Sequence, residues 1–143
     1  MRVPPKQLAP NRRARRGTAA VEFAVIAPIM MTMILGIIDF GRAMMVLETL
    51  NNAARSGARA GALAGDANTD ISSAVTTALT NSGINNPSVA ITVNGQAVDA
   101  STAVSGDSIG VSVSVPYSQV SWLPGTLFLN GATLTGNVVM RRE

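Results

Sequence analysis

Cysteine and histidine are both absent from the 143-residue sequence, and only 3% of its residues are aromatic. Without cysteine, the chain has neither a disulfide framework nor thiolate chemistry. Without either residue, the usual zinc sites, imidazole bases and Ser-His or Cys-His nucleophiles are excluded. The sequence also has no phosphate-binding loop, no paired-carboxylate pattern and no calcium loop. We therefore expect a chain that is not an enzyme and that uses no cofactor or metal.

Acidic residues are missing from residues 1–17, which carry six basic side chains: Arg2, Lys6, Arg12, Arg13, Arg15 and Arg16. Residues 18–143 carry five basic and eight acidic residues, a net charge of −3. Because the cations form a short tail beside an apolar run, they indicate a membrane topology signal with a cytoplasmic N-terminus, and no nucleic-acid partner. The leader also contains three prolines. We expect it to be extended and solvated, with no fold of its own.

The apolar run from Thr18 to Ile38 has 21 residues and one charge, which is enough for a helix to cross a hydrocarbon core of ~30 Å. Pro28 lies within it, as membrane helices tolerate. We therefore predict a transmembrane helix over residues 18–39. A three- and four-residue apolar period continues over residues 40–65, which predicts a helical extension beyond the membrane. A stripe of small residues on this extension would allow close approach by another helix: Gly57, Gly61 and Gly65.

Residues 66–143 are predicted to form a small α/β domain. Asp70 is the expected N-cap of a short helix whose apolar face carries Ile71, Val75, Ala78 and Leu79. Period-two alternation around residues 89–93, 109–115 and 134–140 predicts antiparallel strands covered on one face. The aromatic residues Tyr117 and Trp122 lie near a Pro-Gly turn and are expected in the core, with a docking surface as the alternative. The fold class is therefore α+β, with a long N-terminal transmembrane helix followed by a short helix and an antiparallel sheet.

Glu22 is a carboxylate inside the apolar run, where a charge costs about 2.5–3.5 kcal/mol at the membrane centre and less near an edge. It could lie at the headgroup boundary without a role. Alternatively, cleavage after Gly17 would create an amine on Thr18, which Glu22 could pair with in its own chain or, better, in a neighbouring subunit. Such pairing would remove two buried charges and set the axial register between subunits.

One stretch of the chain is similar to the processing motif of type IV-like prepilins of the tight-adherence (Tad, or Flp) pilus. In this stretch, basic residues are followed by Gly17, Thr18, Glu22 and Phe23. The longer stretch 17–63 resembles the TadE/TadG-like family. The residues that carry this resemblance are Phe23, Pro28, Gly36, Asp39, Phe40, Gly41, Arg42, Ala54, Arg55, Gly57 and Arg59.

The resemblance implies a minor pilin or pseudopilin of the bacterial inner membrane, with one span and its C-terminal domain in the periplasm. A prepilin peptidase would remove residues 1–17. The implied partners are this peptidase, the Flp pilin and other Tad pseudopilins, the inner-membrane assembly platform and membrane lipid. Two alternatives stay open: an unprocessed single-span envelope protein whose periplasmic domain binds a partner or ligand, and a secreted binding domain.

Charged residues beyond the apolar run have two interpretations each. Asp39 and Arg42 lie three apart on a helix and could pair, or they could simply mark the polar boundary of the membrane. Arg55 and Arg59 could meet Glu48, Asp66 or acids of a partner, or they could form a solvated face.

Overall fold

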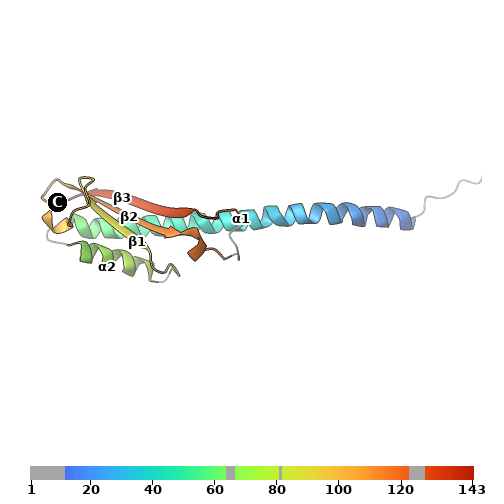
Figure 1. Ribbon diagram of the computed structural model, residues 1–143, viewed down its shortest axis with the longest axis horizontal. Helices are drawn as coiled ribbons and strands as arrows, with labels where there is room; N and C mark the ends of the chain where they lie inside the picture. Colours follow the sequence, from blue (N-terminus) through green and yellow to red (C-terminus); the bar gives the residue numbers. More distant parts are fainter. Residues whose placement is uncertain (1–11, 64–66, 81, 123–127) are drawn as a thin grey trace, which may run out of the picture. The chain divides into compact units, whose positions relative to one another are not determined.

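The computed structural model describes residues 12–63, 67–80, 82–122 and 128–143, with side chains from Gly17 onward. The elements in chain order are α1 (Arg12–Ala62), α2 (Asn68–Leu79), β1 (Ser88–Val93), β2 (Ser108–Pro116) and β3 (Thr133–Arg141). Figure 1 shows this order, which confirms the α+β class with a long N-terminal helix, a short helix and an antiparallel sheet. The chain divides into two compact units, Met1–Ile37 and Ile38–Glu143.

The first unit contains the N-terminal part of α1. The helix begins at Arg12, so the expectation of a leader without a fold is wrong for residues 12–17. Arginine and alanine, which occupy residues 12–16, are good helix formers, and this propensity extends the helix back beyond the apolar run. Between Gly17 and Ile34 every side chain is exposed except the half-buried Ala27. The helix from Gly17 is long and apolar enough to cross a membrane, and an 18-residue window within it has a mean hydropathy of 2.3.

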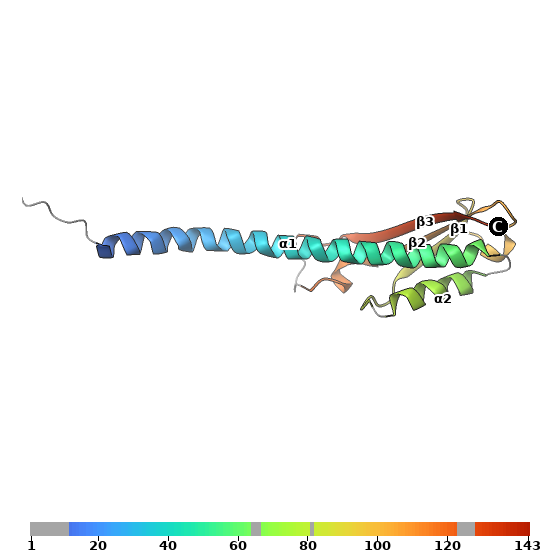
Figure 2. The ribbon, with the colours of Figure 1, turned by 180° about the vertical axis from the view of Figure 1, so that it is seen from behind.

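The second unit is built on a three-stranded antiparallel sheet in the order β1-β2-β3. Ile109, Val111, Val113 and Val115 of β2 are fully buried, as the period-two pattern predicts. The C-terminal part of α1 and α2 both lie against the sheet, which is visible from both sides in Figures 1 and 2. The strand positions and the one-sided cover are therefore as expected.

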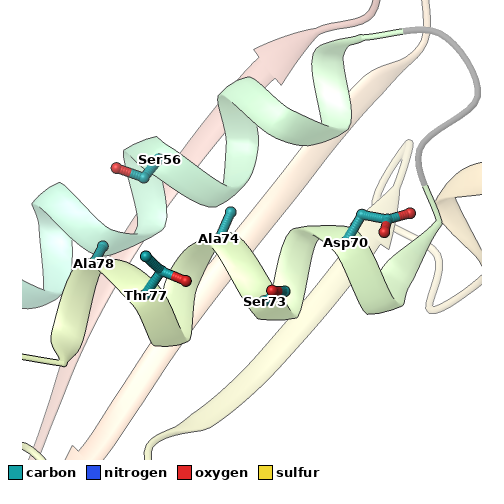
Figure 3. Close-up of a pocket in the computed structure, with 6 residues that line it drawn as sticks. All are labelled: Ser56, Asp70, Ser73, Ala74, Thr77 and Ala78. Carbon is teal, nitrogen blue, oxygen red and sulfur yellow. The ribbon is translucent and has the colours of Figure 1, made fainter.

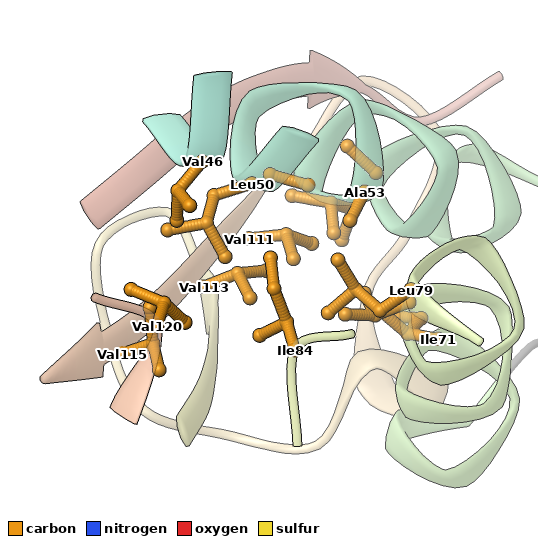
Figure 4. Packing of buried hydrophobic residues seen from close by; sticks show 14 of the residues in the cluster. Val46, Leu50, Ala53, Ile71, Leu79, Ile84, Val111, Val113, Val115 and Val120 are labelled. Atoms are coloured by element: carbon orange, nitrogen blue, oxygen red, sulfur yellow. The ribbon is translucent and has the colours of Figure 1, made fainter. Parts of the chain in front are cut away.

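The core lies between the two helices and the inner face of the sheet. Figure 4 shows side chains from all three layers meeting there: Val46, Leu50 and Ala53 of α1, Ile71 and Leu79 of α2, and Val111, Val113 and Val115 of β2. Ile84 and Val120 close the cluster from the connecting segments. Alanine and glycine on α1 bring its backbone close to this core, because they present little side chain to the neighbouring layers.

Two connections show how local chemistry fixes the ends of the elements. Asn94 and Gly95 have φ values of 50° and 81° and form the two-residue turn after β1, as their sequence predicts. The predicted N-cap of α2 is wrong by three residues. Ala67 is the N-cap, and Asp70 sits in the first turn, where its carboxylate accepts a 3.0 Å hydrogen bond from the Ala67 N–H. Ala78, predicted to face the core, is exposed.

Candidate functional site

The predicted processing motif lies at the beginning of the apolar part of α1. Gly17, Thr18, Glu22 and Phe23 are all helical and exposed. Thr18 and Glu22 are four residues apart, so they share one face of the helix. A methyl group added at Gly17 would have no neighbour within 4 Å. A side chain at residue 17 would therefore meet no neighbour among the described residues.

Asp39 lies at the other end of the apolar run and is 1% exposed. The Tyr117 hydroxyl donates to Asp39 Oδ1 and also lies 2.8 Å from the Asp39 backbone oxygen. Ser121 Oγ is 3.5 Å from the same Oδ1. Burial, followed by the hydrogen bond to Asp39, raises the pKa of Tyr117, so the phenol stays a neutral donor. Asp39 is thus a buried acceptor rather than a solvated boundary residue.

Arg42 follows one turn later and points to the same connection between β2 and β3. Its Nε donates a 3.0 Å hydrogen bond to the Val120 carbonyl oxygen, and its guanidinium carbon lies 4.7 Å from the centre of the Trp122 ring. Within the part of the chain that the structure describes, no carboxylate pairs with Arg42 within 4.0 Å, so Asp39 and Arg42 act separately. Trp122 is 65% exposed, and the prediction that it fills the core is wrong.

These contacts join the start of the second unit to a segment 78 residues away in the chain. Tyr117 belongs to a short 3-10 turn, Tyr117–Gln119, that directly follows β2. Pro116 ends β2 and sets the turn, which delivers the Tyr117 hydroxyl to Asp39 and the Val120 carbonyl to Arg42. We refer to Asp39, Arg42, Tyr117, Val120 and Trp122 as the exit cluster, because they surround the point at which α1 leaves its apolar run.

The remaining predicted residues divide between the two faces of α1. Ala54, Gly57 and Gly61 are buried, whereas Phe40, Gly41, Arg55 and Arg59 are exposed. Gly36 is half-buried and Pro28 is exposed. Gly65 and Asp66 lie outside the described residues. The small-residue stripe packs within its own chain, since a methyl group at Gly57 would lie 2.6 Å from Val75 Cγ2 of α2 and 3.3 Å from Val111 Cγ1 of β2.

A shallow, open groove of about 530 Å³ with a mixed polar and apolar lining lies between the two helices, and Figure 3 shows its lining. Ser56 comes from α1, and the other lining residues come from α2: Asp70, Ser73, Ala74, Thr77 and Ala78. Its one carboxylate already accepts the Ala67 N–H. Among the described residues there is no group of three His, Cys, Asp or Glu side chains that could hold a metal ion.

The exposed apolar stretch, the buried acid at its end and the small-residue face form one continuous segment of α1. Residues 17–59 match the model of the TadE-like protein family. The match confirms the predicted resemblance and covers just under a third of the chain. Comparison with curated proteins and with solved structures gave no match.

The TadE-like segment begins at Gly17 and ends at Arg59, three residues before the end of α1. It contains Asp39 and Arg42 but neither Tyr117 nor Trp122, so the exit cluster joins the segment to the rest of the chain. A TadE-like domain indicates a protein associated with the Tad pilus.

Sequence reasoning missed the role of Tyr117 and of one glycine. A buried tyrosine usually needs a partner for its hydroxyl, and Asp39 is an acid at a predicted boundary, 78 residues away in the chain. Gly136 of β3 is a lone glycine inside a strand, a pattern that marks close approach of another backbone. A methyl group there would lie 2.5 Å from the Leu50 carbonyl carbon and 2.6 Å from the Asn51 nitrogen of α1.

Proposed function

We propose that the chain is a non-enzymatic minor pilin, or pseudopilin, needed to assemble a Tad (Flp) pilus. The observation that carries this proposal is that the TadE-like segment coincides with a helix whose side-chain exposure changes between Ile38 and Asp39. From Thr18 to Ile38 its apolar side chains are exposed apart from the half-buried Ala27 and Leu35, and from Asp39 onward one face is buried within the second unit. An exposed apolar surface of that length is stable in lipid, and the adjoining packed unit provides a surface for other subunits.

The membrane placement follows from charge and hydropathy. The arginine-rich leader stays in the cytoplasm, residues 18–39 span the inner membrane, and residues 40–143 face the periplasm. Membrane lipid then covers the exposed side chains of the apolar run. The single span keeps the protein in contact with the inner-membrane assembly platform, the Flp pilin and other pseudopilins.

Processing creates the assembly contact. A prepilin peptidase cleaves between Gly17 and Thr18, and the new Thr18 amine becomes the cation for Glu22 of an adjacent subunit. Two charges that are each costly in a low dielectric cancel when they pair, so the contact favours subunits held at one axial offset. The exposed position of Glu22 leaves its carboxylate accessible to such a neighbour.

The first test changes the charge and keeps the shape. Glu22→Gln should insert and be processed like the natural protein, but should co-purify far less with the Flp pilin and the other pseudopilins from crosslinked membranes. Glu48→Gln is the matched control, since Glu48 is also an exposed glutamate on α1 but lies beyond the apolar run. Recovery of partners by Glu22→Gln at the level of the control would refute the charge-pairing mechanism.

A second test concerns the cleavage site. Gly17→Leu should abolish processing, because a bulky side chain before the scissile bond blocks the close approach of a peptidase to the backbone. Gly41→Leu on the same helix should be processed normally, because Gly41 lies 24 residues beyond Gly17, and the first carbon of a side chain at either glycine meets no neighbour within 4 Å. Intact mass after co-expression with the peptidase distinguishes the two. Normal removal of residues 1–17 from Gly17→Leu contradicts the proposed site.

One observation favours the alternative of an unprocessed single-span envelope protein. The helix runs without a break from Arg12 through the Gly17–Thr18 bond, so residues 12–17 continue the helix of the proposed span. In that case the mature chain begins at Met1, and the periplasmic unit binds its partner without any axial charge pairing.

A further inference from the structure

Trp122 is the single tryptophan of the sequence, and the residue is 65% exposed. It lies beside Arg42 rather than in the core, although the core of this chain is otherwise aliphatic apart from Tyr117. A large indole ring exposed to water is unfavourable, so the position needs a physical reason.

The height of Trp122 along α1 is fixed by the exit cluster. The Arg42 Nε bond to the Val120 oxygen and the Tyr117 bond to Asp39 hold this connection against the first turn after Ile38. At 1.5 Å per residue, Arg42 lies about 6 Å beyond Ile38 along the helix. The polar interface on each side of a hydrocarbon core is about 5–7 Å thick. Trp122 is therefore held at the level of the headgroups if the apolar run fills the core.

The chemistry at this level matches a lipid interface. Phe40, in the same turn of α1, is 62% exposed. The Arg42 guanidinium has no carboxylate partner within 4.0 Å among the residues that the structure places, and it lies over the indole face. Tryptophan is enriched at membrane–water interfaces, and arginine there buries its stem and directs its charge to phosphate. A protein partner at this point would have to compete with the headgroups of the bilayer that adjoins it.

We propose that Trp122 inserts into the headgroup region of the membrane and, with Arg42 and Phe40, holds the strand-rich unit against the periplasmic surface. The inference rests on the proposed insertion of residues 18–39. It adds a second lipid contact, made by a segment 78 residues away from the exit of the span. The occupant of this surface is phospholipid, with the Arg42 cation between the indole ring and the lipid phosphates.

The single tryptophan allows a direct test on the full-length protein. The purified chain is reconstituted into phosphatidylcholine–phosphatidylglycerol vesicles, and its fluorescence is measured with phospholipids brominated at different depths of the acyl chain. We expect blue-shifted emission, weak quenching by aqueous acrylamide, and stronger quenching by bromines near the headgroup than by bromines near the chain end.

The matched control moves the reporter to the far end of the same unit. In Trp122→Phe with Val104→Trp, the new tryptophan replaces a 66% exposed valine in the turn that pairs with the C-terminal residues beside Ala62. Its emission should be red-shifted, quenched by acrylamide and several-fold less sensitive to bromolipid than that of Trp122.

The outcomes separate the inference from the function on which it rests. If the protein floats with the vesicles but Trp122 behaves like the control reporter, the span is inserted and the interfacial contact is wrong. If the protein fails to float with the vesicles, the proposed membrane insertion is wrong and the inference falls with it. Depth-dependent quenching of Trp122 alone supports both.

Discussion

The three glycines at positions 41, 57 and 136 allow one substitution to be tested in three surroundings. Gly41 and Gly57 are both inside α1, where glycine to alanine gains up to ~1 kcal/mol of helix stability. At Gly41 a new methyl group meets nothing within 4 Å. Gly41→Ala should therefore stabilise the chain by up to about 1 kcal/mol.

At Gly57 the same gain is opposed by overlap. The new methyl carbon would lie 2.6 Å from Val75 Cγ2, in a core where both neighbouring layers are packed. Overpacking of this kind typically costs ~1–3 kcal/mol. Subtraction of a helix gain of up to ~1 kcal/mol leaves a net loss of about 0–2 kcal/mol in the free energy of unfolding, and the short 2.6 Å contact favours the upper part of that range.

Gly136 is the most restrictive of the three positions. The methyl carbon would lie 2.5–2.8 Å from backbone atoms of Leu50 and Asn51, which cannot rotate away as a side chain can. Strand β3 would have to separate from α1, so we expect a loss at or above ~3 kcal/mol, the upper end for overpacking. Position 136 also gains no helix propensity, because it lies in a strand.

The assay is pulse proteolysis of the full-length chain in detergent micelles across a urea series, which reports the unfolded fraction at each concentration. The predicted order of unfolding midpoints is Gly41→Ala, the natural chain, Gly57→Ala and then Gly136→Ala. A double variant, Gly57→Ala with Val75→Ala, should be less destabilised than the sum of its single changes, because the second change removes the overlapping methyl. A Gly136→Ala midpoint equal to that of the natural chain would refute the packing of the sheet on α1.

Two further predictions concern polar groups of the second unit. Tyr117→Phe should lower the free energy of unfolding by about 1–3 kcal/mol, because it leaves the buried Asp39 carboxylate without its donor. Adding Asp39→Asn to this variant should recover part of that loss. Strictly additive effects of the two substitutions would contradict the contact. The pKa of Asp107 is lowered from 3.8, first by the Val104 N–H and then by the Asn94 side chain, so its contribution to stability is full above 3.8 and is lost as pH falls through the lowered value. Asp107→Asn should therefore make the acid loss of the urea midpoint shallower, and an unchanged acid limb would contradict this.

The sheet could be predicted from sequence because the signal is local. In β2, apolar residues alternate with glycine and serine: Ile109, Val111, Val113 and Val115. This period of two is typical of a strand that is covered on one face. The turn at Asn94–Gly95 has the same local origin, since both residues tolerate positive φ. The start of α2 was less predictable, because an acid in the first turn can stabilise a helix either as the cap or from a position three residues later.

The exit cluster could not be predicted, because its contacts join residues 78 apart in the sequence. The spacing of Asp39 and Arg42 allows a pair. In the structure Asp39 instead accepts a hydrogen bond from the Tyr117 hydroxyl, and Arg42 donates one to the Val120 carbonyl oxygen. Trp122 was placed in the core by its size and its neighbouring Pro-Gly. The cation of Arg42 instead binds the ring face at the surface, a preference that depends on tertiary structure.

The central claim is that Glu22 finds its counter-ion in an amine released at Thr18. An intact-mass measurement of the protein purified from its native membrane tests this claim most directly. The account predicts a chain that lacks residues 1–17 and begins at Thr18. A full-length chain that still carries Met1 and the six basic residues of the leader would contradict it.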